Sequence, residues 1–103
     1  MIEFYVSCKS KEGANKHPPL IANTIRQCLF DHQIIASGRE FYMYINAERH
    51  NPDDYKNAVL LSFLCKIDRT SDLTIDELKV ALEPAFNKLS EEDGLENFRI
   101  SKS

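Results

Sequence analysis

The residue types that most often carry out chemistry, cysteine and histidine, are few and dispersed in this sequence of 103 residues. The thiols are Cys8, Cys28 and Cys65, and the imidazoles are His17, His32 and His50. Each cysteine lies in an apolar segment, so we expect reduced thiols that pack in the core. A structural zinc site takes about four such ligands at short, regular spacings, and the sequence holds no group of that kind. We therefore predict no metal site, no cofactor and no catalytic residues, and we do not expect an enzyme.

A basic group, made of Lys9, Lys11, Lys16 and His17, precedes a pair of prolines. A helix that begins at these prolines would offer its free N–H groups to an anion. Proline carries no N–H, however, and the segment lacks a glycine-rich phosphate-binding pattern. We interpret residues 7–16 as a solvated loop.

The densest acidic cluster is formed by Glu91, Glu92 and Asp93. At the end of a helix these side chains would oppose the helix dipole, which is unfavourable for folding and would point to a function. Alternatively, Ser90 could cap a new short turn in which the acids are favourable. Acidic surfaces on small domains neutralise basic partners through complementary charge. We take the three acids as candidate partner-binding residues.

The overall composition is typical of a small soluble globular protein, with 43% hydrophobic and 28% charged residues. We expect residues 1–103 to form a single domain. The formal net charge of −3 provides no overall basic surface, so we do not expect nucleic acid as a partner. The sequence shows no leader segment and no apolar run near 18 residues, so we expect no membrane association and, by default, a cytoplasmic location.

The longest apolar run, residues 58–67, is the segment around which the other elements must be arranged. As a strand it presents one uninterrupted apolar face, which consists of Val59, Leu61, Phe63, Cys65 and Ile67. The alternative is a helix over residues 52–66, because Asn51 and Pro52 look like a cap and a first-turn proline. That alternative gives a smaller sheet with three helices. We favour the strand, since as a helix the polar residues leave no clean apolar stripe.

Alternating apolar residues predict further strands at residues 2–7, 40–45 and 97–101. Apolar residues at helical spacing predict a first helix from about Pro19 to Asp31. Residues 33–40 allow two interpretations. Either the first helix continues to residue 36 and ends at a glycine, or a strand begins at residue 34 and bulges there.

A second helix is predicted to follow Thr74, which forms a capping box with Glu77. Its apolar residues fall on one stripe. Pro84 lies inside this pattern, and proline removes a backbone hydrogen bond, so we expect the helix to kink or restart there.

The predicted order is β-α-β-β-α-β, the ferredoxin-like α+β pattern with an antiparallel sheet and two helices on one face. Right-handed crossovers place both helices on the same side of the sheet. The residues expected to point at the helices are Phe4, Val6, Phe41, Met43, Ile45, Val59, Leu61, Phe63, Ile67, Phe98 and Ile100.

The opposite face of the sheet has no predicted helix to cover it, although a terminal segment or the loop at residues 47–57 could fold over it. Its residues are Tyr5, Ser7, Tyr42, Tyr44, Leu60, Ser62, Leu64 and Arg99. A face with this share of aromatic and aliphatic side chains is typical of a contact site. We take its tyrosines and leucines as candidate partner-binding residues, with self-association as the commonest form of contact.

These features predict a small non-catalytic protein-binding module that acts through the open sheet face or the acidic cluster. Inhibitor and immunity proteins share this profile of small size, acidity and missing motifs, and a regulatory role fits it too. The partner would be another protein, basic if it meets the acidic cluster, or a second copy. The alternative is a domain that binds single-stranded nucleic acid or a small ligand on its tyrosines. RNA-recognition domains stack bases on an open sheet in this way, but residues 39–44 lack their motif.

Overall fold

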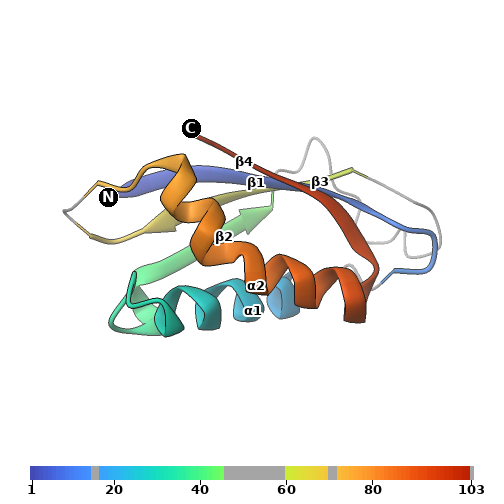
Figure 1. Ribbon diagram of the computed structural model, residues 1–103, viewed down its shortest axis with the longest axis horizontal. Coiled ribbons are helices and arrows are strands. Elements are labelled where there is room, and N and C mark those ends of the chain that lie inside the picture. Colours follow the sequence, from blue (N-terminus) through green and yellow to red (C-terminus); the bar gives the residue numbers. More distant parts are fainter. Residues whose placement is uncertain (15–16, 46–59, 70–71, 103) are drawn as a thin grey trace.

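The chain follows the order β-α-β-β-α-β in the computed structural model, which describes residues 1–14, 17–45, 60–69 and 72–102 (Figure 1). The elements are β1 (Ile2–Ser10), α1 (Pro18–Asp31), the 3-10 turn η1 (Gly38–Glu40), β2 (Phe41–Ile45), β3 (Leu60–Ile67), α2 (Ile75–Asp93) and β4 (Leu95–Lys102). The predicted succession of strands and helices is confirmed.

The four strands form one antiparallel sheet in the order β2-β3-β1-β4. Because β1 and β2 are both antiparallel to β3, they run parallel to each other with β3 between them. Right-handed crossovers of this split βαβ kind place both helices on one face. Figure 1 shows α1 and α2 side by side there, and the predicted ferredoxin-like arrangement is confirmed.

The apolar run forms β3, an interior strand that pairs with β1 on one side and β2 on the other. Its helix-facing side chains are each at most 1% exposed: Leu61, Phe63, Cys65 and Ile67. Hydrogen-bonded ladders on both sides satisfy the backbone groups of such a buried strand. The helical alternative is therefore wrong for residues 60–66, whereas residues 52–59, Val59 among them, lie outside the described residues.

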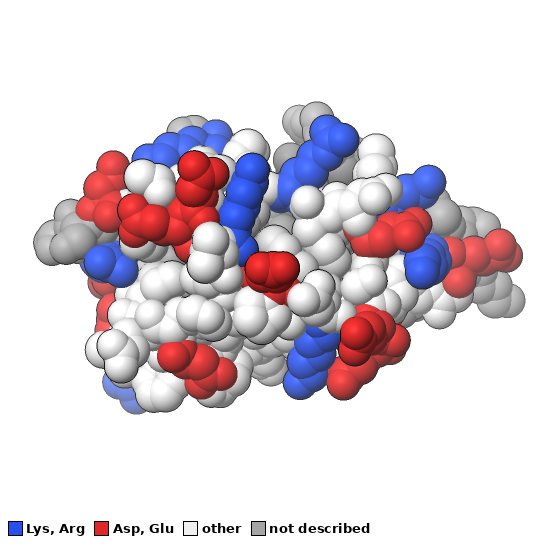
Figure 2. All heavy atoms as spheres, viewed as in Figure 1, with Lys and Arg blue, Asp and Glu red and all other residues white. Residues whose placement is uncertain are grey.

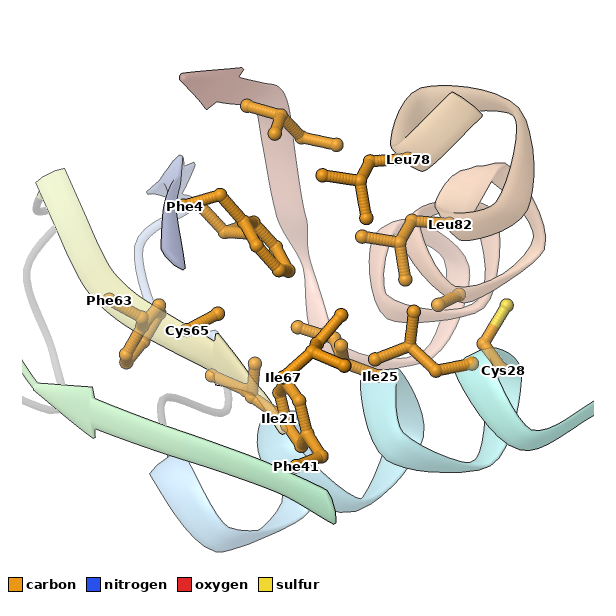
Figure 3. Close-up of a cluster of buried hydrophobic side chains, with 14 of the residues drawn as sticks. Phe4, Ile21, Ile25, Cys28, Phe41, Phe63, Cys65, Ile67, Leu78 and Leu82 are labelled. Atoms are coloured by element: carbon orange, nitrogen blue, oxygen red, sulfur yellow. The ribbon is translucent and has the colours of Figure 1, made fainter. Parts of the chain in front are cut away.

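The core fills the space between the sheet and the two helices (Figure 3). Labelled side chains from both layers point toward one another there, among them Phe4 and Phe63 from the sheet, Ile25 from α1 and Leu82 from α2. Most residues predicted to face the helices are buried, while two are half-buried against the core: Met43 and Phe98. Ile45 keeps the inward register but is 40% exposed, because it ends the edge strand β2.

The end of α1 differs from both interpretations of residues 33–40, since the helix stops at residue 31. Gln33 adopts a positive φ of 59°. The N–H groups of Gln33 and Ile34 donate to the carbonyls of Phe30 and Leu29 at 3.0 and 2.9 Å. This is a Schellman ending with glutamine where glycine is usual. Both interpretations are wrong, because neither considered a left-handed residue other than glycine.

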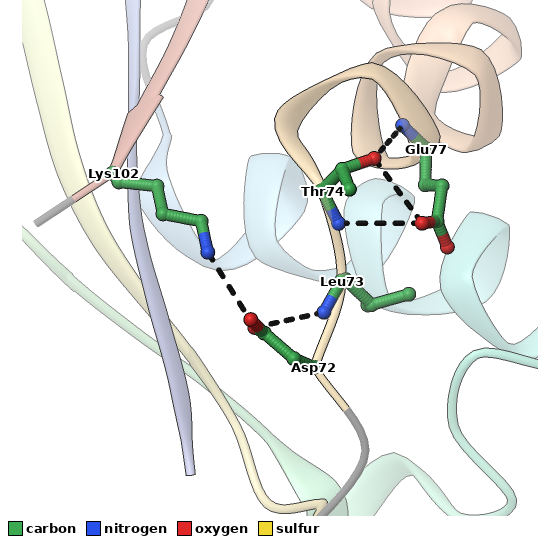
Figure 4. A network of polar contacts seen from close by, with 5 residues as sticks. All are labelled: Asp72, Leu73, Thr74, Glu77 and Lys102. Carbon is green, nitrogen blue, oxygen red and sulfur yellow. Dashed lines mark hydrogen bonds and ion pairs between the residues drawn. The ribbon is translucent and has the colours of Figure 1, made fainter.

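The capping box that begins α2 is confirmed (Figure 4). Thr74 Oγ1 accepts a hydrogen bond from the Glu77 N–H at 3.1 Å, and Glu77 Oε1 accepts one from the Thr74 N–H at 3.5 Å. The helix does not restart at Pro84, which lies within one continuous element, although its axis changes direction along its length in Figure 1. Pro84 and Val80, whose carbonyl lacks its usual helical donor, are both exposed. Water can therefore satisfy that carbonyl.

A polar contact ties the end of β4 to the start of α2, also drawn in Figure 4. Asp72 Oδ1 accepts hydrogen bonds from the Leu73 N–H at 2.9 Å and from Lys102 Nζ at 3.4 Å. The Leu73 N–H first, and the Lys102 charge second, hold the pKa of Asp72 below its usual value. These contacts favour one geometry for the connection into α2.

Two strands are longer than predicted. β1 continues to Ser10, so Lys9 belongs to the sheet and the predicted loop is wrong for residues 8–10. β4 begins at Leu95, two residues before the predicted start. Asn97 has a φ of 56° beside a one-residue shift in the β1–β4 register. Such a bulge lets Leu95 and Phe98, three residues apart, both face the core, which breaks the sequence alternation.

Candidate functional site

The outer face of the sheet, opposite the helices, brings together all the tyrosines and leucines predicted to bind a partner. We call this set, Tyr5, Tyr42, Tyr44, Leu60 and Leu64, the tyrosine face. Tyr44, Leu64 and Tyr5 form one cross-strand row over β2, β3 and β1. Tyr42 and Leu60 lie on the same side because they are an even number of residues from Tyr44 and Leu64. Residues distant in sequence thus share one surface.

The tyrosine face is accessible in the described part of the chain. Tyr42, Tyr44 and Leu60 are 44%, 52% and 63% exposed, whereas Tyr5 and Leu64 are half-buried and Ser62, on the same side of β3, is buried. Both described helices pack on the opposite side of the sheet. An apolar and aromatic surface in this position is typical of a contact site.

Polar side chains adjoin Tyr44 on this face. Lys66 Nζ lies 3.3 Å from Glu3 Oε1 and 5.7 Å from the centroid of the Tyr44 ring. A cation over a ring is attracted to its negative face. Exposed ion pairs contribute little to stability. The two contacts of Lys66 restrict the positions of the Glu3 and Tyr44 side chains.

The acidic cluster belongs to the other layer of the molecule. Glu91, Glu92 and Asp93 form the last turn of α2, so the interpretation in which Ser90 caps a new turn is wrong. Acids at this end oppose the helix dipole. The helix is closed instead by Gly94, which adopts a left-handed φ of 69°. The cluster is therefore a second surface, separate from the tyrosine face.

The three cysteines are free thiols, and all are buried. Burial raises the pKa of Cys8 and Cys65 to about 12 and also raises the pKa of Cys28. Thiols of this kind are protonated at neutral pH and react slowly as nucleophiles. Cys28 Sγ donates to the Ala81 carbonyl at 2.9 Å and lies 3.9 Å from Nδ1 of His32, one helical turn further along. No three potential metal ligands are grouped among the described residues.

Sequence reasoning missed that Lys9 belongs to the sheet and projects onto the outer face near Arg99. Arg99 pairs in register with Ser7, and Lys9 follows Ser7 by two residues on the same side of β1. The alternation of Arg99 with its apolar neighbours did place it on the outer face. Its proximity to Lys9 depends on the register between β1 and β4, which local patterns do not contain.

Neither the distribution of charge nor a comparison with other proteins points to a particular function. In the view of Figure 2, acidic and basic side chains are interspersed with broad neutral areas. Of the helices in the described ranges, none is long and apolar enough to cross a membrane. The sequence matches no protein-family model, and a search of curated proteins finds no significant relative.

Proposed function

We propose that this protein is a non-catalytic binding module that holds another protein against its tyrosine face. The observation that carries the proposal is the exposure of Tyr42, Tyr44 and Leu60, at 44%, 52% and 63%, on the side of the sheet away from both helices. Aromatic and aliphatic side chains that are exposed together on one face are typical of an interaction site.

The chemistry of the tyrosine face fits a protein partner. Tyrosine is enriched in protein interfaces because its ring buries a large area while its hydroxyl can hydrogen-bond at the rim. Charged side chains, Glu3 and Lys66, stand beside the tyrosines and supply polar contacts. A second copy of the chain is one form that the partner can take. Inhibition or regulation would follow if the covered surface of the partner were its active site.

The acidic cluster supports a second contact within the same proposal. Glu91 and Glu92 are exposed at the C-terminal end of α2 and Asp93 is half-exposed there, where their charge works against the helix dipole. A basic protein would relieve this repulsion, as expected for an inhibitor or immunity protein. Removing the charge with Glu91→Gln, Glu92→Gln and Asp93→Asn should abolish recovery of a basic partner. Unchanged recovery would exclude the cluster from the interface.

A cytoplasmic location is also part of the proposal. It is supported by the three buried thiols, which carry no disulfide. Free thiols are the usual state of cysteine in a reducing compartment.

The main test compares Tyr42→Ala/Tyr44→Ala with a control that removes equally exposed side chains from the helix layer. Phe30→Ala/Val80→Ala serves this purpose, because Phe30 on α1 and Val80 on α2 are 49% and 71% exposed. Both variants are used in affinity capture with identification by mass spectrometry, and their masses in solution are measured by light scattering. Loss of a partner or of a dimer in the tyrosine variant alone is expected.

Wild-type association of the tyrosine variant with itself and with every captured protein would refute the proposal. A purified sample whose 260/280 nm absorbance ratio is high and falls in salt would assign the face to nucleic acid instead.

A further inference from the structure

A cavity of about 340 Å³ opens at one end of the outer sheet face, beside the tyrosine face. Its walls include Ser7 and Lys9 from β1, Leu60 from β3, and Asn97 and Arg99 from β4. β1 lies between β3 and β4 in the sheet, so three neighbouring strands contribute residues to the cavity. The apolar lining is formed by Cys8, Leu60 and Leu61, of which Leu60 faces Lys9 across the β1–β3 ladder.

The cavity is basic although the chain as a whole carries a net charge of −3. Lys9 and Arg99 supply two positive charges, and no acidic side chain lines the cavity among the described residues. Within the same ranges, none of the ion pairs involves Lys9 or Arg99. Glu96 faces Lys9 across the ladder, but its carboxylate is 3.9 Å from Lys11 Nζ. The two cations can therefore meet an external anion.

The backbone that shapes this cavity adopts an uncommon conformation. Asn97 has a φ of 56°, which is sparsely populated by residues other than glycine, and it lies at the β1–β4 register shift. Bulges of this kind re-aim side chains and occur often beside functional sites. Here the bulge lies next to Arg99 and places an amide side chain in the cavity wall.

We propose that this cavity binds the phosphate group of a ligand. The Lys9 and Arg99 side chains supply opposite charge, and the Ser7 hydroxyl and the Asn97 amide donate further hydrogen bonds. Arginine suits this role because its planar N–H groups match the geometry of phosphate oxygens. The four polar residues of this site lie outside the tyrosine face, although Leu60 belongs to both, and phosphate binding does not depend on the protein-binding proposal.

The neighbourhood of the cavity indicates what the phosphate is attached to. Tyr5 precedes Ser7 by two residues on the same side of β1, about 7 Å along the strand. Its ring is therefore within reach of a base whose phosphate occupies the cavity. Stacking of a base on an aromatic ring raises affinity by roughly 5- to 150-fold. A nucleotide and free phosphate share the phosphate chemistry, and their affinities distinguish them.

The test is a titration of the ¹⁵N-labelled protein with sodium phosphate, followed by NMR, with sodium chloride as the reference at matched ionic strength. Saturable shifts are expected in the amides of residues 7–9 and 97–99. Lys9→Gln and Arg99→Gln should each weaken phosphate binding by about tenfold or more, since each removes a charge-assisted hydrogen bond. The matched control is Lys79→Gln, which removes an exposed lysine from α2 and should change the affinity by less than about twofold. Circular dichroism confirms that each variant is folded.

A second titration uses thymidine monophosphate. Tighter binding than inorganic phosphate, lost in Tyr5→Leu, identifies a nucleotide as the ligand, whereas equal affinities identify free phosphate. Tyr42→Ala/Tyr44→Ala should bind phosphate as the wild type does, even if it loses a protein partner. Shifts that chloride reproduces, or an Arg99→Gln variant with wild-type affinity, would overturn the phosphate site.

Discussion

Alanine substitutions on the two faces of β3 should lower the unfolding free energy by very different amounts. Phe63 is fully buried, and its replacement by alanine leaves a cavity in the core, which costs about 3–5 kcal/mol. Leu60, three residues earlier, is 63% exposed. Full burial of a leucine stabilises a protein by about 1.5–3 kcal/mol. With about a third of the side chain covered, Leu60→Ala should cost about 0.5–1 kcal/mol.

Equilibrium unfolding in urea, followed by far-ultraviolet circular dichroism, measures both changes. A domain of this size has an unfolding free energy of about 5–15 kcal/mol. Phe63→Ala should therefore shift the midpoint strongly, whereas Leu60→Ala should remain close to the wild type. An unchanged dependence on urea concentration would show that each substitution alters stability and not the extent of unfolding.

A loss of about 2 kcal/mol or more for Leu60→Ala would contradict the exposure of this side chain, because a loss of that size requires a side chain that is packed on all sides. The outer face would then be covered in the free protein, and the protein-binding proposal would lose its support. A loss below about 1 kcal/mol for Phe63→Ala would contradict the placement of β3 in the core.

Three further changes follow from local contacts. Thr74→Ala should lower the unfolding free energy by about 1 kcal/mol because the cap loses its acceptor, whereas Thr74→Ser should keep most of it; equal urea midpoints for the two would contradict this. Gln33→Gly should raise the unfolding free energy by about 0.5–1 kcal/mol, since glycine adopts a positive φ without a side-chain clash, and a lower thermal midpoint would count against it. Cys8 and Cys65 have pKa values raised from 9.0 to about 12 in the folded protein. Their contribution to stability is therefore complete below pH 9 and should be lost as the pH rises from 9 to 12, by up to about 1.4 kcal/mol per pH unit for each thiol. A Cys65→Ala variant with the same alkaline slope as the wild type would refute this contribution.

The elements that could be predicted are those whose signal is local and repeated. Phe4 and Val6 alternate with polar neighbours in β1, and Leu61 to Ile67 alternate in β3, because one face of each strand must be buried. The capping box of Thr74 and Glu77 marks the start of α2, since the hydrogen bonds that make it join residues only three apart. Such signals need no knowledge of distant parts of the chain.

The elements that could not be predicted depend on distant contacts. Gln33 adopts a positive φ that is rare for glutamine, whereas Asn97 adopts one that asparagine tolerates more readily, at the point where the β1–β4 register shifts. The register between β1 and β4 shifts by one residue, and Phe98 of β4 stacks on Phe86 of α2 with 4.4 Å between the ring centroids; neither is contained in a local pattern. The continuous α2 through Pro84 also reflects tertiary packing, because proline alone favours a break.

In the candidate site, the side of each strand that a residue occupies follows from the amino-acid pattern, because alternation in a strand assigns faces directly. This pattern identifies Tyr5, Tyr44 and Leu64 as outward residues. Three further facts emerge from the folded chain alone: these three residues form one row, Lys9 and Arg99 line one cavity, and the acids at residues 91–93 remain on α2 in the other layer. The physical reason is that neighbours across a sheet are set by long-range pairing, whereas the face of a residue is set by the backbone of its own strand.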